Sequence, residues 1–225
     1  VGLPNGFWHL PIFHLENTMT NKPAKKCVIL LLGLPGSGKT TLARVLQARL
    51  KCPWFNADKV RATLSLDLGF SEKDRLKQAE RMGQLCSLVL EYEESGFVIA
   101  DFVNPTAQTR FEFLSALKYP THLVSGSPGQ TVDRLDLTEA PDVYTIFMNT
   151  LKPGDSRYED TARRFSNPEV DQVDMRIDAF PEGDAYSERL HSHICAMVHN
   201  VPKSGRHSSV FDGRGIKVIH TRPLL

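Results

Sequence analysis

The segment ILLLGLPGSGKTTLARVL, Ile29 to Leu46, decides the fold class of this 225-residue chain. Residues 33–40 fit the pattern G-x-x-x-x-G-K-[ST] at every fixed position. In this pattern the glycines let backbone N–H groups curl around phosphate oxygens, and the start of the following helix adds partial positive charge. An apolar strand leads into the loop and apolar residues at helical spacing follow it, which argues against a chance glycine-rich turn. The segment therefore predicts a nucleotide-binding site.

The individual side chains of this loop have separate expected roles. Lys39 would reach the β- and γ-phosphates, and the hydroxyl of Thr40 would ligate Mg²⁺. ATP and Mg²⁺ are thus the expected cofactors. The residues expected to contact the ATP phosphates are Gly33, Pro35, Gly36, Ser37, Gly38, Lys39, Thr40 and Thr41.

The composition is that of a soluble globular protein, with 41% hydrophobic and 24% charged residues. Lys and Arg number 27 and Asp and Glu 26, which gives no support for a general nucleic-acid-binding or membrane-binding surface. No apolar run approaches the ~20 residues that span a bilayer. The four cysteines are far apart and form no CxxC pair, which favours reduced thiols, a cytoplasmic location and no zinc site.

Strand-like and helix-like segments alternate along the chain, which is typical of a parallel sheet with right-handed crossovers. We expect strands at 26–32, 54–58, 97–101, 143–149 and 173–177, and helices at 39–50, 72–94, 106–117 and 185–199. The predicted fold is α/β: a P-loop NTPase, similar to nucleoside-monophosphate kinases, arranged as a three-layer sandwich with a parallel sheet of about five strands.

The absence of an NKxD tetrad argues against a small switch protein, and favours transfer of a phosphoryl group to a small acceptor. Such transfer needs a carboxylate near the γ-phosphate, cations for the acceptor, and a lid that excludes water. Asp58 follows the second expected strand, at the sheet edge where ligands bind. Asp101 ends the third strand, FVIAD, as a Mg²⁺ ligand does. The expected catalytic residues are Lys39, Asp58 and Asp101, and the expected metal ligands are Thr40, Asp58 and Asp101; either aspartate could be the base.

The segment FNADKVRATLSLDLGFSEKDR, Phe55 to Arg75, follows GLPGSGKTTLA and resembles the adenylylsulfate kinases. That family phosphorylates the 3′-hydroxyl of adenosine 5′-phosphosulfate with ATP, in sulfate assimilation. The family motif D-G-D-N-V-R is matched in part, and the motif D-L-G-F-S-x-x-D-R is matched in full. The resemblance covers about residues 28–113.

The resemblance implies roles for residues at the matching positions. Asp58 would be the catalytic or Mg²⁺-organising carboxylate. Arg61 and Arg75 would contact the sulfated nucleotide, and Phe70 would stack on its adenine. The residue types suit this acceptor, because a phosphosulfate and a flat base require cations and an aromatic face. Phe70 as an ordinary core residue is an alternative of similar weight.

Several positions depart from the family pattern. In the family's D-G-D-N motif, Asn56 stands in place of the first Asp and Lys59 in place of the Asn. The family's E-N-x-R-R segment is KQAER at 77–81 in this chain, and its F-I-S-P loop is FVNP at 102–105. We expect Asn104 in this last segment to contact the acceptor. These changes preserve phosphoryl transfer but leave the acceptor open.

Outside the motifs, we expect an N-terminal arm (1–25), a kinase domain (26–200) with an insertion at about 119–141 and a lid at about 152–168, and a C-terminal tail (201–225). The lid would bring arginines over the phosphates: Arg157, Arg163 and Arg164.

Other functions remain open at this stage. The segment ADFVNPTAQTR, with Asp101, Asn104 and Arg110, resembles the kinase half of polynucleotide kinases, which phosphorylate 5′-hydroxyl ends. A nucleic acid would be a partner under that reading alone. A kinase for another metabolite, and a nucleotide-binding protein without transfer activity, are further alternatives. The sequence also leaves a homodimer open.

Overall fold

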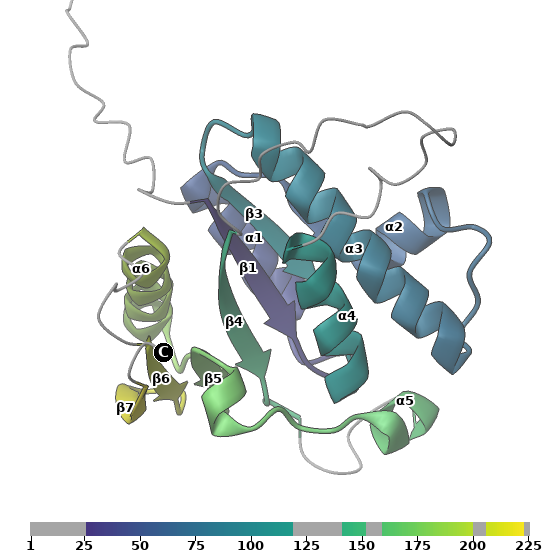
Figure 1. Ribbon diagram of the computed structural model, residues 1–225. Helices are drawn as coiled ribbons and strands as arrows, with labels where there is room; N and C mark the ends of the chain where they lie inside the picture. Colours follow the sequence, from purple (N-terminus) through teal and green to yellow (C-terminus); the bar gives the residue numbers. More distant parts are fainter. Residues whose placement is uncertain (1–25, 119–140, 152–158, 200–205, 223–225) are drawn as a thin grey trace, which may run out of the picture.

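The computed structural model describes residues 26–118, 141–151, 159–199 and 206–222. The expected N-terminal arm, nearly all of the expected insertion and Arg157 of the expected lid lie outside the described residues. Within the described part, seven strands form one sheet with helices on both faces (Figure 1). The predicted three-layer α/β fold is confirmed.

The five strands expected from the sequence are present, and they pair in parallel. All six residues of the first strand, Cys27–Leu32, are buried, as its continuous apolar sequence requires. The order across the sheet is β2-β3-β1-β4-β5-β6-β7. The five strands are β1 (Cys27–Leu32), β2 (Trp54–Asn56), β3 (Phe97–Asp101), β4 (Asp142–Met148) and β5 (Met175–Ile177).

The sheet has two strands more than the five expected. Both lie in residues 201–225, where we expected a tail. Strand β6 (Arg206–Phe211) pairs in parallel with β5, and β7 (Ile216–Arg222) returns antiparallel to β6. Phe211 is fully buried, so β6 adds to the core. The hairpin has a local signal, because the apolar ends of VFDGRGI flank an Asp-Gly turn.

Two separate groups of helices cover the sheet because alternate residues of β1 point to opposite faces. Ile29 and Leu31 pack with α1 (Lys39–Leu50) and α6 (Asp184–His199). Val28 and Leu30 pack on the other face, with the helices α2 (Ala57–Thr63), α3 (Glu72–Tyr92) and α4 (Ala107–Lys118). No helix in the described ranges is long and apolar enough to cross a membrane.

The described part of the expected lid is the short helix α5 (Glu159–Arg164), followed by the 3₁₀ turn η2 (Val170–Gln172). The chain after α5 is attached to the segment that follows β3. Phe165 stacks on Phe147, with ring centroids 5.9 Å apart, and the Ser166 N–H donates to the Pro105 carbonyl at 2.8 Å. This end of α5 is therefore fixed near the carboxyl edge of the sheet.

Candidate active site

The phosphate-binding loop joins β1 to α1 and is held in place by the end of β4. Gly33 has φ +144°, and a Cβ built there would lie 2.5 Å from the Met148 carbonyl oxygen, so the position requires glycine. The Ser37 N–H donates to the Leu34 carbonyl at 3.1 Å and closes the loop. The Thr150 hydroxyl donates to the Ser37 carbonyl at 3.0 Å. The loop thus closes on itself by a hydrogen bond, and it is also held by Met148 and Thr150, which are distant from it in sequence.

Lys39 is folded back onto its own loop. Its Nζ donates to the carbonyl oxygens of Gly33 at 2.9 Å and Leu34 at 2.8 Å. Burial lowers the pKa of Lys39 to about 8, and the negative charges of Asp101 and Asp58 oppose this shift. A phosphate oxygen would replace the two carbonyl groups and stabilise the charged form, so the lysine is suited to the role predicted for it.

Thr40, Asp101 and Asn56 form one hydrogen-bonded group. Oδ2 of Asp101 accepts from the Thr40 hydroxyl and from the Asn56 amide, each at 2.9 Å. Oδ1 of Asp101 is buried and has no hydrogen-bond partner among the described residues. A buried carboxylate oxygen without a donor fits Mg²⁺ or a water bound to it, because Mg²⁺ takes oxygen ligands and keeps several waters.

The described residues contain no group of three or more His, Cys, Asp or Glu side chains that could hold a metal ion. A magnesium site would therefore depend on Thr40, Asp101 and the phosphate oxygens of the nucleotide. This is the usual arrangement for Mg²⁺ at phosphoryl-transfer sites, where one or two side chains act with the substrate. Two of the three predicted ligands, Thr40 and Asp101, are brought together in this way.

Asp58 lies in the first turn of α2 and not at the end of a strand. The expected strand end at 58 is wrong because β2 stops at Asn56, whose side-chain oxygen caps α2 by accepting the N–H groups of Asp58 at 3.1 Å and Lys59 at 3.2 Å. The carboxylate is exposed, and its charge acts on the pKa of both Lys39 and Arg61. The Asp58 carboxylate therefore lies near enough to Lys39 and to Arg61 for its charge to act on both.

Arg61, Phe70 and Arg75 lie together, and we name them the acceptor cluster. The guanidinium carbons of Arg61 and Arg75 lie 4.8 and 5.7 Å from the centroid of the Phe70 ring. Phe70 is 66% exposed, so the alternative of a core residue is wrong. Burial and the charge of Arg75 lower the pKa of Arg61, and Asp58 opposes this. Two neighbouring arginines without a carboxylate at salt-bridge distance in the described structure favour an anionic ligand.

The arginines of this cluster are held by backbone groups. Arg61 donates to the carbonyl oxygen of Gly69 at 2.5 Å, and Nε of Arg75 donates to that of Phe70 at 2.9 Å. Each guanidinium keeps further N–H groups for a ligand, since an arginine has five. The loop between α2 and α3 therefore fixes the positions of both cations.

Other residues of the D-L-G-F-S-x-x-D-R motif build local structure. The Ser71 hydroxyl caps α3 by accepting the Asp74 N–H at 3.2 Å. Asp67 forms a bidentate ion pair with Arg81, with N–O distances of 2.6 and 2.7 Å. Gln78, in place of the family's Asn, is buried and its amide approaches the Ala57 carbonyl at 3.4 Å. Much of the motif is thus explained by folding of the α2–α3 segment.

The segment after β3 is enclosed. Asn104 is fully buried in a left-handed conformation with φ +47°, and neither atom of its amide has a partner in the part that the structure describes. Arg110 is 8% exposed and donates to the carbonyl oxygens of Asn104 at 3.5 Å and Ser166 at 3.1 Å. Arg110 therefore connects α4 to the chain after α5. The acceptor role of Asn104 stays a prediction.

The lid arginines that the structure describes lie on the outer surface of α5. Arg163 and Arg164 are exposed, and Arg164 pairs with Asp160 at 3.3 Å. Neither residue forms a hydrogen bond or an ion pair with the phosphate-binding loop in the described structure. Their closure over the phosphates stays a prediction.

Three residues at the site were not identified from the sequence: Asn56, Thr150 and Phe180. Asn56 had a local signal, because an Asn followed by an acidic residue and a short helix is a common N-cap pattern. Thr150 and Phe180 follow β4 and β5, and they reach the phosphate-binding loop through the order of strands in the sheet. No pattern within either segment predicts these contacts.

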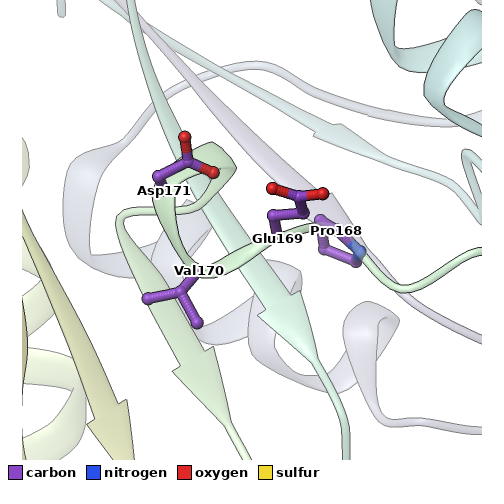
Figure 2. Close-up of a pocket in the computed structure, with 4 residues that line it drawn as sticks. All are labelled: Pro168, Glu169, Val170 and Asp171. Carbon is purple, nitrogen blue, oxygen red and sulfur yellow. The ribbon is translucent and has the colours of Figure 1, made fainter.

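A separate pocket of about 480 Å³ lies at η2, and Figure 2 shows Pro168, Glu169, Val170 and Asp171 on its wall. Its described lining carries two carboxylates and no cation. Such a lining is unsuited to phosphate, and none of the site residues above contributes to it. The pocket is therefore distinct from the nucleotide site.

Comparison with known proteins relates the first half of the chain to one family. Residues 25–124 match the family model described as adenylylsulphate kinase. An adenylyl-sulfate kinase of Marinobacter nauticus is 32% identical over 114 residues, 48% of this chain and 56% of that protein. An adenylyl-sulfate kinase of Deinococcus deserti is 26% identical over 168 residues, 72% of this chain and 88% of that protein. The chain thus spans about half the length of some of these relatives and more of others.

Solved structures agree in fold. The Mycobacterium tuberculosis APS kinase CysC in complex with AMPPNP and APS has a TM-score of 0.53 at 17% identity, covering 78% of this chain and 98% of that one. A hexameric APS kinase from Thiobacillus denitrificans has a TM-score of 0.54 at 22% identity, covering 80% of this chain and 30% of that one. The chain therefore resembles the adenylylsulfate kinases in sequence over residues 25–124, and it has the P-loop α/β fold of those enzymes.

Proposed function

We propose that this chain is an ATP-dependent kinase that transfers the γ-phosphoryl group to the 3′-hydroxyl of adenosine 5′-phosphosulfate. The observation that carries the proposal is the position of Asp58 at the start of α2. Its N–H donates to Asn56, whose amide donates to Asp101, and Arg61 lies one turn further along the same helix. A carboxylate between donor and acceptor is the arrangement that phosphoryl transfer to a hydroxyl requires. The similarity of residues 25–124 to adenylylsulfate kinases supports the choice of acceptor.

In the proposed reaction, the acceptor hydroxyl oxygen forms a bond to the γ-phosphorus while the bond from that phosphorus to the ADP oxygen breaks. Asp58 orients the hydroxyl and takes its proton. Lys39 stabilises the negative charge on the phosphoryl oxygens as the transfer proceeds. Magnesium, held by Thr40, Asp101 and the phosphates, would neutralise charge on the β- and γ-oxygens.

The acceptor cluster suits the two ends of adenosine 5′-phosphosulfate. The guanidinium groups of Arg61 and Arg75 can donate to phosphate and sulfate oxygens, and the exposed face of Phe70 can stack on adenine. Arg110, on which a polynucleotide kinase reading depended, donates to two backbone carbonyl groups and is buried. The structure therefore favours a nucleotide acceptor held by the α2–α3 segment.

The test measures ADP release with and without adenosine 5′-phosphosulfate. We expect this acceptor to raise ADP release well above the background hydrolysis of ATP. Lys39→Ala and Asp58→Asn should each lower the acceptor-dependent rate by about 100-fold or more, the usual loss for a charge-stabilising group or a general base. Asp171→Asn, which changes an exposed carboxylate at η2, is the matched control and should leave the rate unchanged.

Other outcomes separate the alternatives. ADP release that rises with an oligonucleotide 5′-hydroxyl and not with adenosine 5′-phosphosulfate would replace the acceptor. ATP binding without turnover on either acceptor would mark a nucleotide-binding protein that does not transfer phosphate. Equal rates in Asp58→Asn and the unaltered chain would remove Asp58 from its role and indicate Asp101 as the base.

A further inference from the structure

Asn56 is the last residue of β2 and the N-cap of α2, and its side chain joins two parts of the proposed site. Its oxygen accepts the N–H groups of Asp58 at 3.1 Å and Lys59 at 3.2 Å. Its amide nitrogen donates to Oδ2 of Asp101 at 2.9 Å. One half-buried side chain therefore connects the start of α2 to the carboxylate expected to hold Mg²⁺.

The register of the strands brings this side chain to the carboxylate. Asn56 is paired with Asp101 in the parallel strands β2 and β3, and Asp101 is paired with Leu31 of β1. Residues that are directly paired point to the same face of a sheet. Leu31 belongs to the core that α1 covers, so the side chains of Asn56 and Asp101 lie on that face too. Asn56 therefore reaches Asp101 from the β2 side, opposite to β1.

The orientation of the Asn56 amide is determined by its neighbours. Two backbone N–H groups need an acceptor and a carboxylate needs a donor, so exchanging the oxygen and nitrogen of the amide would break all of these hydrogen bonds. A carboxylate at this position could cap α2 but could not donate to Asp101. The position thus requires an acceptor at one atom and a donor at another, which asparagine supplies.

The two oxygens of Asp101 have different surroundings. Oδ2 accepts from both Thr40 and Asn56, which approach it from α1 and β2. Oδ1 is buried and has no hydrogen-bond partner in the part of the chain that the structure describes. Two donors on one oxygen restrict rotation of the carboxylate, so the other oxygen stays available in one direction. Hydrogen bonds of this kind orient the ligands of metal sites and tune their affinity.

We propose that Asn56 is a positioning residue that presents Oδ1 of Asp101 to Mg²⁺ and joins this carboxylate to the helix that carries Asp58. Asn56 acts through Asp101 and not by contact with the substrate. The inference rests on the nucleotide site proposed above and adds a link between its metal and the acceptor side. Without the Asn56 amide, the carboxylate can rotate, and its affinity for Mg²⁺ falls.

The experiment measures ATP affinity by titration calorimetry over a range of Mg²⁺ concentrations. Asn56→Ser retains a cap for α2 but has no second polar group for Asp101. Half-maximal ATP binding should then need about 10-fold more Mg²⁺, a usual cost of removing a group that orients a metal ligand. Asp212→Ala, which removes a side-chain oxygen from the N–H groups of Arg214 and Gly215, is the matched control. It should lower the midpoint of urea unfolding and leave the Mg²⁺ requirement unchanged.

A double-mutant cycle tests whether Asn56 acts through Asp101. Asn56→Ser should add no further shift to a chain that already carries Asp101→Ala, because the carboxylate that it positions is absent. An unshifted Mg²⁺ curve in Asn56→Ser would overturn the inference, since Asn56 would then only cap α2. The same shift with and without Asp101→Ala would also overturn it. Either result leaves the kinase proposal in place.

The unaltered chain separates this inference from the proposed function. ATP binding that needs no Mg²⁺ would overturn the role of Asn56, and no ATP binding at all would overturn both proposals. Mg²⁺-dependent ATP binding without ADP release on addition of adenosine 5′-phosphosulfate would overturn the proposed function alone, because the role of Asn56 is measured by binding.

Discussion

The Thr40 hydroxyl donates to Oδ2 of Asp101 at 2.9 Å, while Oδ1 of the same carboxylate is buried without a partner among the described residues. Leaving a buried carboxylate oxygen without a donor costs about 1–3 kcal/mol or more. A cation or its bound water would remove that cost. We therefore expect Thr40 and Asp101 to stabilise a bound nucleotide in a way that depends on Mg²⁺.

Asp101→Asn should raise the Mg²⁺ concentration needed for half-maximal ATP binding, because the neutral amide offers a weaker oxygen ligand. We expect a shift of about 10-fold or more, which corresponds to at least one charge-assisted contact. The measurement is ATP affinity across a Mg²⁺ titration. Asp171→Asn is the control, and an unshifted Mg²⁺ curve in Asp101→Asn would contradict a metal role for this residue.

Asn56→Asp should make the stability of the protein depend on pH. The substitution keeps an N-cap oxygen for α2 but places a second carboxyl group beside Oδ2 of Asp101. Two carboxyl groups in contact share a proton, so one pKa rises above its usual range and the pair is stable while protonated. Stability should therefore be lost as pH rises above about 4, the ordinary pKa of an aspartate, toward the raised pKa of the pair.

Thermal unfolding at several pH values measures this effect, and added Mg²⁺ should restore part of the loss at high pH by screening the two charges. Asn56→Ala separates the contributions, because it removes the cap, at a cost of about 1 kcal/mol, without adding charge. A pH-independent loss in Asn56→Asp, equal to that in Asn56→Ala, would show that capping alone matters.

The phosphate-binding loop and the contact of Thr40 with Asp101 were predictable because their signals are local or follow from topology. A short loop pattern specifies the backbone of Gly33 to Thr40, and parallel strands end at the same sheet edge, which brings Asp101 to Thr40. The proximity of Arg61, Phe70 and Arg75 agrees with the single site that the family resemblance implies for them, and their acceptor role stays a prediction. The end of β2 was placed two residues too late, and α2 was not predicted, because β2 is only three residues long and Asn56 belongs to both strand and cap.

Features that depend on long-range pairing were not predictable. Strand β6 is added to the sheet by hydrogen bonding to β5, about thirty residues earlier, and its short sequence has little periodicity of its own. Phe180 was passed over for the same reason. Phe180 contacts Gly38 because only β4 separates β5 from β1 in the sheet, and because the β6–β7 turn packs against the backbone of Phe180.

Phe70→Ala should weaken binding of the acceptor and leave the stability of the protein and its affinity for ATP nearly unchanged. The ring is 66% exposed, so its removal deletes little buried area, but it would remove the stacking surface for the acceptor base. We expect the KM for adenosine 5′-phosphosulfate to rise by about 5- to 100-fold. Steady-state kinetics with each substrate varied in turn provides the measurement. Tyr92→Ala, at a more exposed aromatic residue on α3, is the control, and an equal rise in the KM for ATP would argue against an acceptor role.

ATP binding should take up a proton above about pH 8, because burial lowers the pKa of Lys39 to about 8 in the free protein. The phosphates raise this pKa again on binding, since they stabilise the charged form. Below pH 8 the lysine is already charged and the full contribution to affinity is present; as pH rises above 8, each binding event must add a proton and the affinity falls. Calorimetry in buffers of different ionisation enthalpy measures the uptake. Lys39→Met should bind ATP weakly at every pH and take up no proton. Equal proton uptake in Lys39→Met and the unaltered chain would assign the titration to another group.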